Sequence, residues 1–254
     1  MRRLEDKRTA IMNRTIWLYW EGPQPPYIAL CYRTVLKHNE QVRMLDRSGF
    51  EELFKSDRDI DIDRLALNHK SDFIRAYLLK HYGGLYVDAD CLVLRSLRPV
   101  LELAEERGFV GYREPQGYMS CNFMASVAGG AVISEHYARV CQTLRSQSAL
   151  EWLDLASTPM EQTIAAHPSE SLILPTDCVM PVNWSESEQF CVMRADEEHE
   201  QFLRGEAYCY MLSNHTIKSR LQTRILCYMP EADLLGSRYF ISFLFRKSLL
   251  NGGQ

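Results

Sequence analysis

Two periods of hydrophobic and polar residues alternate along the chain, and they predict strands and helices that follow one another. The runs that predict strands are short, apolar and bounded by Gly, Pro or polar residues, and they lie at residues 15–20, 42–45, 85–87, 109–112, 122–125, 172–174 and 207–212. Apolar residues recur at helical spacing over residues 25–37, 50–54, 65–82, 134–144 and 158–166. This alternation is typical of an α/β sheet covered by helices.

The helix predicted over residues 65–82 leads directly into the most informative strand. Gly83 and Gly84 end the helix, because glycine readily adopts a helix C-cap conformation, and they also let the backbone pass close to a ligand. The strand at 85–87 then runs through Asp88-Ala89-Asp90 into the apolar residues 91–94. Ligands in α/β folds bind outside the carboxyl ends of strands, so the acidic triplet stands where a site is expected.

Two carboxylates separated by one residue can act on one cation. In an extended backbone alternate side chains point the same way, so we expect Asp88 and Asp90 to share a face and Ala89 to point away. Their oxygens suit Mg²⁺ or Mn²⁺, and their mutual repulsion favours a bound cation. The same spacing recurs in residues 59–63 without an apolar strand before it, and we interpret that instance as a solvated helix start.

The run from Ser71 to Asp90 resembles the core pattern of a large group of glycosyltransferases. That pattern, SD..R...L...GG.Y.D.D, has every fixed position filled here. The group includes capsular polysaccharide synthesis proteins, sugar transferases with a DxD motif and, more distantly, the clostridial glucosylating toxins. Weaker similarity extends over residues 15–220, including an opening strand, a segment at 31–46 and a segment at 118–125.

The resemblance implies an α/β fold of the GT-A type, a single Rossmann-like domain with a mixed central sheet flanked by helices. We expect a polar N-terminal tail over residues 1–14, the glycosyltransferase domain over 15–230 and a C-terminal helical extension over 231–254. The nucleotide-sugar half would take residues 15–110 and the acceptor half residues 111–230. The apolar segment 239–250 is expected to pack on the core, with an interfacial helix as the alternative.

The resemblance also implies roles for four charged residues. Asp90 would coordinate Mn²⁺ or Mg²⁺ directly, and Asp88 would bind the donor ribose and reach the metal through water. Asp72 and Arg75 would contact the transferred sugar and its phosphate. These two residues are three positions apart on the predicted helix and can pair, so a structural salt bridge is the alternative.

Donor-binding roles are implied for four further residues. Trp20, at the end of the first predicted strand, would stack on the base, with a place in the core as the alternative. Tyr86 would line the donor pocket beside the metal-binding triplet. Gly83 and Gly84 would let the backbone approach the donor.

Two candidates lie in the acceptor half. Asn122 would orient the donor sugar or the acceptor, unless it is only a turn residue. His215 follows the last predicted strand and is a candidate third ligand for the metal or the diphosphate, with a surface histidine as the alternative. For a separate catalytic base the sequence offers Glu161, Asp177 and Glu186 without singling one out.

Composition narrows the range of partners. The formal net charge is −4 and no dense basic block occurs, which disfavours long nucleic acids and suits a small diphosphate held through a metal ion. Eight cysteines without a CxxC pair favour reduced thiols, and no apolar stretch reaches the length of a membrane span. We therefore expect a cytoplasmic protein, either free or peripheral at the inner face of the membrane.

The expected function is metal-dependent sugar transfer of the hexosyltransferase type. The donor would be a nucleotide-sugar, with a UDP-sugar as first candidate, and the acceptor a glycan, a lipid-linked saccharide or a protein. The resemblance implies retention of anomeric configuration and a place in capsular polysaccharide or other surface glycan synthesis. The alternatives are a metal-dependent nucleotide-sugar hydrolase and a family member that binds nucleotide-sugar without turnover.

Overall fold

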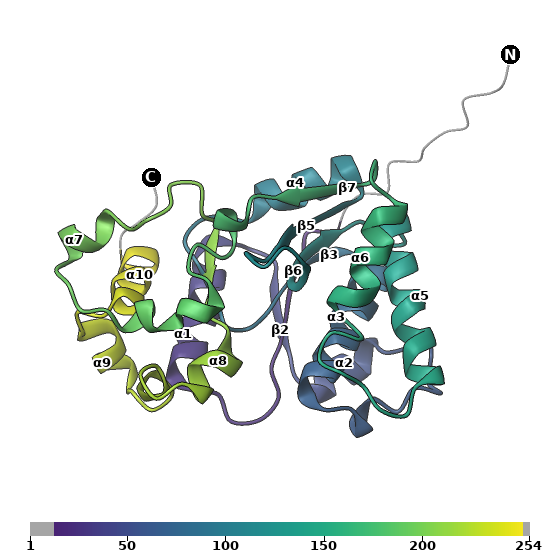
Figure 1. Ribbon diagram of the computed structural model, residues 1–254, viewed down its shortest axis with the longest axis horizontal. Helices are drawn as coiled ribbons and strands as arrows, with labels where there is room; N and C mark the ends of the chain where they lie inside the picture. Colours follow the sequence, from purple (N-terminus) through teal and green to yellow (C-terminus); the bar gives the residue numbers. More distant parts are fainter. Residues whose placement is uncertain (1–12, 251–254) are drawn as a thin grey trace, which may run out of the picture.

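A mixed sheet of six strands forms the centre of the computed structural model, which describes residues 13–250. The first twelve residues of the predicted polar tail lie outside this range. Strand order is β2-β1-β3-β6-β5-β7 (Figure 1). The strands span Ile16–Tyr19 (β1), Val42–Leu45 (β2), Gly84–Val87 (β3), Phe109–Arg113 (β5), Met119–Ser126 (β6) and Ser171–Leu174 (β7).

Strand direction changes at the middle of this sheet. β1 runs parallel to both β2 and β3, whereas β6 runs antiparallel to β3 and to β5, and β7 is parallel to β5. The mixed sheet implied by the resemblance is therefore confirmed. The carboxyl ends of β1, β2 and β3 meet at one edge, which is where ligands collect in such sheets.

The central strands are buried on both faces. Trp17 and Tyr86, which lie side by side in the register of β1 and β3, point into one core cluster, while Ile16 and Leu85 point into the other. A sheet covered on both sides requires apolar residues at successive positions, and this explains why these strands read as continuous apolar runs.

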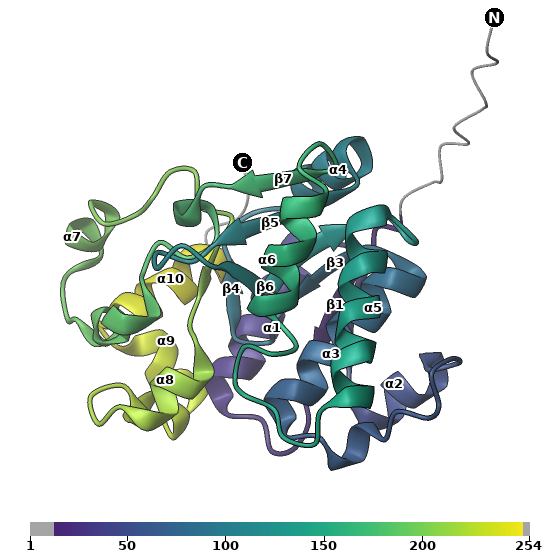
Figure 2. The same cartoon turned by 45° about the vertical axis from the view of Figure 1, so that its right-hand side comes forward.

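Helices supply the two layers. One face is covered by α2 (Arg47–Leu53), α3 (Leu67–Tyr82), α5 (Ala131–Ser146) and α6 (Ser157–Ala166), which lie together on one side of the sheet in Figure 2. The other face packs against α1 (Pro26–His38) and α4 (Arg98–Arg107).

The C-terminal elements gather beyond the edge of the main sheet (Figure 1). β4 (Cys91–Val93) pairs there with β8 (Cys209–Met211) in a separate two-stranded sheet. The helices of this region are α7 (Asp196–Glu200), α8 (Asn214–Ser219), α9 (Glu231–Gly236) and α10 (Phe240–Leu249). α10 packs against α1 and α9 and buries most of its aromatic residues, which confirms core packing of the segment 239–250.

Short 3₁₀ helices at Ile62–Arg64, Thr176–Cys178, Trp184–Cys191 and Arg224–Cys227 connect the larger elements. The first of them begins at the capping residue Asp61, which agrees with our interpretation of the acidic run 59–63 as a helix start. All eight cysteines are free thiols, as the sequence predicts. Among residues 13–250, no helix combines the length and the apolar character needed to cross a membrane.

The Asp88–Asp90 triplet is where the backbone differs from the prediction. β3 ends at Val87, and Ala89 and Asp90 lie in a turn closed by a 3.1 Å hydrogen bond from the Cys91 N–H to the Asp88 carbonyl. The chain leaves the main sheet here, because β4 belongs to the second sheet. The extended backbone predicted through the triplet is therefore wrong, and the turn brings the two carboxylates together instead.

The two glycines at the junction of α3 and β3 also require a correction. Gly83 caps α3 as predicted, with a φ of 67°, and its N–H bonds to the Leu79 carbonyl. A Cβ on Gly83 would lie 2.7 Å from the Ala128 nitrogen, and one on Gly84 would lie 2.3 Å from the Thr15 carbonyl oxygen. The backbone at Gly83 and Gly84 thus passes close to neighbouring backbone where β3 begins. Asp88 follows the opposite end of this strand, so the two glycines do not bring the backbone close to a donor bound there.

Candidate active site

A cleft of about 860 Å³ opens at the carboxyl end of the parallel strands. One wall comes from the ends of β1 and β3 and the first turns of α3. The opposite wall is assembled from the β5–β6 hairpin, the loop before α6, Trp184 and the beginning of α8. The volume is within the usual range for a site that encloses a nucleotide-sized ligand.

Arg75 is the fixed cation of this cleft. Its guanidinium group lies 3.4 Å from Asp72 and 3.1 Å from Asp88, and it donates a hydrogen bond of 3.0 Å to the Ser71 hydroxyl. The pairing of Asp72 with Arg75 on one helix face is as predicted. The sequence did not predict the ion pair between Arg75 and Asp88, because that contact depends on how α3 packs beside the turn.

Asp90 is the most enclosed carboxylate of the acidic turn. It is 7% exposed, and its side chain accepts a hydrogen bond from the Asn214 N–H at the start of α8. Burial, together with the nearby charge of Asp88, raises the pKa of Asp90 to about 7. Burial also raises the pKa of Asp88, and it raises that of Asp72 to about 6. The cluster is therefore short of positive charge.

These residues fit a hard divalent cation. Asp88 and Asp90 offer carboxylate oxygens, and their raised pKa values reflect the cost of ionising both without a compensating charge. Residues 13–250 contain no group of three or more His, Cys, Asp or Glu side chains that could hold a metal ion. Asp88 and Asp90 would supply two carboxylates, and substrate and water commonly fill further positions where Mg²⁺ binds phosphates.

Tyr86 supports the site from below. It is fully buried, its hydroxyl lies 3.1 Å from the Ser71 hydroxyl, and the Arg75 guanidinium sits 5.2 Å from the centre of its ring. The predicted place of Tyr86 on the wall of the donor pocket is therefore corrected. The side chain lies beneath the cleft and holds Arg75 in position.

Trp20 lies on the cleft wall at the end of β1. The side chain is half-buried, its indole N–H donates to the Gly22 carbonyl at 3.2 Å, and the Lys218 ammonium lies 5.5 Å from the ring centre. The ring also packs against the core cluster around α1 and α10, so the alternative of a core residue stays open. A ring that is held in place and open to a cleft can stack on a base.

Asn122 also lines the cleft, from within β6 rather than from a turn. Its side-chain oxygen accepts a 2.8 Å hydrogen bond from the Tyr112 hydroxyl, and its carbonyl accepts the Asp88 N–H at 2.9 Å. The alternative of a turn residue is wrong. Asn122 connects the hairpin wall to the acidic turn, and its contact with a substrate stays a prediction.

His215 is exposed at the mouth of the cleft. Its ring packs against Trp152, with the ring centres 5.2 Å apart, while the preceding residue, Asn214, makes the contact to Asp90. A role of His215 toward the metal or the diphosphate stays a prediction.

The three acids considered as a catalytic base are engaged elsewhere. Glu161 accepts bonds from Arg113 and from the Met119 N–H, and it is not part of the cleft wall. Asp177 pairs with Arg204 at 3.7 Å, and Glu186 accepts a bond from the Gln189 side chain. They therefore hold local structure together.

Glu114 is a cleft carboxylate that the sequence analysis missed. It follows β5, and its two oxygens accept hydrogen bonds from the Ser120 hydroxyl at 2.9 Å and the Trp184 indole N–H at 3.1 Å. Burial raises its pKa. The available signal was its position directly after a predicted strand, at the edge where ligands bind.

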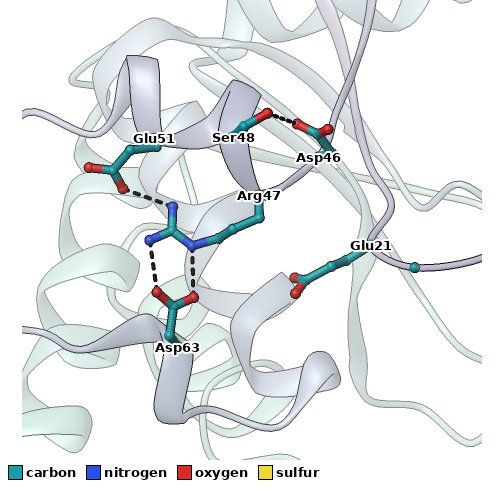
Figure 3. A pocket seen from close by; sticks show the side chains of 7 residues that line it. Glu21, Asp46, Arg47, Ser48, Glu51 and Asp63 are labelled. Atoms are coloured by element: carbon teal, nitrogen blue, oxygen red, sulfur yellow. Dashed lines mark hydrogen bonds and ion pairs between the residues drawn. The ribbon is translucent and has the colours of Figure 1, made fainter.

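A second, shallower hollow of about 530 Å³ lies beside the cleft (Figure 3). Arg47 donates to both oxygens of Asp63, at 2.7 and 3.0 Å, and to Glu51 at 2.8 Å. Asp46 caps α2 through the Gly49 N–H. These polar groups satisfy one another, so this hollow is a surface ion-pair network. Glu21 lies on its rim and also lines the main cleft.

The mixed sheet with an acidic turn at the end of its third parallel strand defines the GT-A fold class. Residues 24–107 match a family model described as "Glycosyltransferase sugar-binding region containing DXD motif". This match includes the whole run from Ser71 to Asp90 and confirms the resemblance to the DxD-containing glycosyltransferases for that segment.

This chain is also similar in sequence or in structure to known glycosyltransferases. "Probable glycosyltransferase FCK3" of Fusarium pseudograminearum (strain CS3096) is 26% identical over 114 residues, which covers 37% of this chain and 28% of that protein. The glycosyltransferase GlyE of Streptococcus pneumoniae TIGR4 superposes with a TM-score of 0.50 at 13% identity, over 94% of this chain and 64% of that one. PaToxG glycosyltransferase gives a TM-score of 0.45 at 12% identity, over 95% and 88%.

The likeness to GlyE confirms the GT-A fold and, at this level of identity, the fold alone. The aligned parts span 28% of the FCK3 protein and 64% of the GlyE chain, so both relatives are longer than the parts that match.

Proposed function

We propose that this protein is a glycosyltransferase that moves a sugar from a nucleotide-sugar to an acceptor hydroxyl with the help of Mn²⁺ or Mg²⁺. A UDP-sugar is the first candidate donor. The observation that carries the proposal is the acidic turn, which places Asp88 and the buried Asp90 in a cleft of about 860 Å³ beside Arg75. The segment that matches the glycosyltransferase family model supports the same conclusion.

Each donor-binding residue has a role that its surroundings support. Asp90 and Asp88 would hold the cation, and the bound cation would act as a Lewis acid that stabilises charge on the leaving diphosphate. Arg75 would add a fixed positive charge near the same oxygens, and because Asp72 and Ser71 already orient it, little reorganisation would be needed. Trp20 would stack on the base.

We further propose retention of anomeric configuration, with a glycan, a lipid-linked saccharide or a protein as acceptor. The pathway we propose is synthesis of capsular polysaccharide or another surface glycan, in the cytoplasm or at the inner face of the membrane. These finer statements rest on the resemblance of the Ser71–Asp90 run.

A metal-dependent nucleotide-sugar hydrolase is the second candidate function. It would use the same carboxylates of the cleft with water as the acceptor. Product analysis separates the two, because a transferase consumes acceptor in proportion to the nucleotide released.

Thermal unfolding with and without Mn²⁺ tests the donor site directly. We expect UDP-glucose, UDP-galactose or UDP-N-acetylglucosamine to raise the melting temperature only when the metal is present, since a ligand at 100 times its Kd stabilises a fold by about 2.7 kcal/mol. ADP-glucose serves as the matched control for the base. A melting temperature that none of these donors changes would contradict the proposal.

A further inference from the structure

The tip of the β5–β6 hairpin carries a carboxylate with an uncommon set of partners. The two oxygens of Glu114 are held by neutral donors, the Ser120 hydroxyl and the Trp184 indole, rather than by an arginine or lysine. Burying a carboxylate beside neutral groups is costly, which is why its pKa rises. A carboxylate has about four lone-pair sites, so about two remain free to accept bonds from a ligand in the cleft.

The position of Glu114 relative to the acidic turn follows from the strand register. Asn122 bonds to the Asp88 N–H through its carbonyl, and Ser120, which holds Glu114, lies two residues before Asn122 in the same strand. Side chains two residues apart in a strand point to the same side and are separated by about 7 Å along it. The Glu114 carboxylate therefore lies on the hairpin wall of the cleft, displaced along β6 from the contact with the acidic turn.

Large apolar side chains line the same cleft as this carboxylate. Trp152 is 59% exposed, Leu67 57%, and Tyr118 and Leu153 37% each, and all four line the cleft. Single exposed apolar residues are ordinary, but four around one polar cleft form a patch of the kind that marks a binding site. Aromatic rings of this kind can pack against the C–H face of a pyranose while its hydroxyl groups reach polar neighbours.

The charges that line the cleft indicate which class of acceptor it can bind. Five carboxylates line it, Glu21, Asp72, Asp88, Asp90 and Glu114, against the two fixed cations Arg75 and Lys218. The positive charge of a divalent cation and the negative charge of a nucleotide diphosphate would largely cancel. An anionic acceptor would therefore meet repulsion at this wall, whereas a neutral one would not.

We propose that this wall is the acceptor subsite, that it takes a neutral saccharide, and that Glu114 is the catalytic residue that accepts the proton of the attacking hydroxyl. In this step the acceptor oxygen bonds to the anomeric carbon of the donor on the face from which the diphosphate leaves, so that the configuration is retained as proposed above. The bond from that carbon to the phosphate oxygen breaks, its electron pair stays on the diphosphate, and the hydroxyl proton passes to a Glu114 oxygen. The inference rests on the proposed glycosyltransferase function.

The Glu114→Gln variant tests the proton-accepting role with water or saccharide as acceptor. The donor is whichever of UDP-glucose, UDP-galactose and UDP-N-acetylglucosamine most stabilises the wild type with Mn²⁺. We expect UDP release to fall about 100-fold or more, the lower end of general-base contributions, while the donor-induced rise in melting temperature stays. Formate should restore part of the activity of Glu114→Ala. The matched control is Glu186→Gln, an exposed carboxylate outside the cleft.

The possible outcomes distinguish a failure of the proposed function from a failure of the role of Glu114. A wild type with neither a donor-induced shift nor UDP release would overturn the proposed function and this inference with it. A wild type that releases UDP, beside a Glu114→Gln variant within about threefold of it, would overturn only the role of Glu114. Parallel loss of donor binding in Glu114→Gln would do the same, because it would place the residue in the donor site.

The acceptor class has its own measurement. Methyl and p-nitrophenyl glycosides of glucose, galactose and N-acetylglucosamine should stimulate UDP release by the wild type, and Trp152→Ala should raise the KM for the stimulating glycoside about tenfold, within the usual range for a stacking contact. Tyr228→Ala, which changes a ring that is 76% exposed outside the cleft, should leave that KM as it is. Donor hydrolysis that no neutral glycoside stimulates would overturn the saccharide assignment.

Discussion

The two walls of the cleft differ in how the chain builds them. The proposed donor wall comes largely from one continuous run, Ser71 to Asp90, in which helix, cap, strand and turn follow directly. The proposed acceptor wall draws on the β5–β6 hairpin, the loop before α6, Trp184 and the beginning of α8, which are separated by long stretches of chain. The donor wall holds buried charges, whereas the acceptor wall presents exposed aromatic and aliphatic side chains.

The residues proposed for sugar transfer and those proposed to select the acceptor thus lie on different kinds of segment. Charges that must meet a metal and a phosphate require a rigid and nearly dry setting, which a helix packed on a strand provides. Side chains that choose an acceptor can sit on loops, because loops vary without disturbing the core.

Asp90→Asn should have the largest effect. The change removes the enclosed carboxylate of the acidic turn, so we expect turnover to fall by about 10³-fold and Mn²⁺-dependent donor binding to disappear. The raised pKa of Asp90 means that its ionised form costs stability in the metal-free protein at neutral pH. The variant should therefore melt at or above the wild-type temperature in EDTA, and turnover within a few-fold of the wild type would contradict the metal assignment.

Arg75→Lys should lower turnover by about 100-fold with a smaller loss of donor affinity. The guanidinium fork contacts Asp72, Asp88 and Ser71 at once, and an ammonium group cannot span all three. Steady-state kinetics and donor titrations measure the two effects. Arg139→Lys, which changes a pair with Glu135 outside the cleft, is the control. Near-normal turnover with a lowered melting temperature would mean that Arg75 is a structural residue.

Trp20→Ala should weaken nucleotide binding by about ten- to a hundredfold, because stacking on a base is worth roughly 1–3 kcal/mol. Mn²⁺ binding in the absence of nucleotide should change much less. Isothermal titration of UDP with Mn²⁺ measures this, and Trp20→Phe should recover much of the affinity. A large drop in melting temperature without a change in UDP affinity would show that the ring serves the core.

Tyr27→Phe should have the smallest effect. The Tyr27 hydroxyl donates to the Asn214 side chain, and Asn214 in turn holds Asp90 through its N–H, so this bond joins α1 to α8 behind the acidic turn. Loss of one such bond costs about 1 kcal/mol. We expect a fall of a few degrees in melting temperature and at most a few-fold change in donor affinity, with Tyr32→Phe on the same helix as control. A loss of turnover as large as that of Arg75→Lys would contradict this ranking.

Sequence alone predicted the helix, its cap and the strand of the proposed donor wall, because their residues are neighbours along the chain. The pairing of Asp72 with Arg75 followed from helical spacing, and the C-cap at Gly83 from glycine chemistry. Boundaries differed by a few residues, as for α2, which begins at Arg47 rather than at residue 50. The turn at Asp88–Asp90 was missed because apolar residues on both sides suggested one continuous strand.

The remaining site residues depend on packing between distant segments, which no local pattern reports. The family resemblance implied a wall position for Tyr86, but the strand turns that ring inward beneath Arg75. Glu114 gains its surroundings from Ser120 and from Trp184, the latter 70 residues further on. A single acidic residue in a predicted loop carries no periodic signal, so its place in the cleft became visible only with the fold.

The contact between Asp90 and α8 has a consequence for how this protein can change over evolution. The donor is the main-chain N–H of residue 214, which nineteen of the twenty amino acids supply and only proline lacks. Substitution at this position can therefore alter the side chain facing Tyr27, and with it the neighbouring mouth of the cleft, while the bond to Asp90 persists. Related chains could diverge freely in this segment and still keep the acidic turn anchored, so sequence drift here is a poor measure of lost activity.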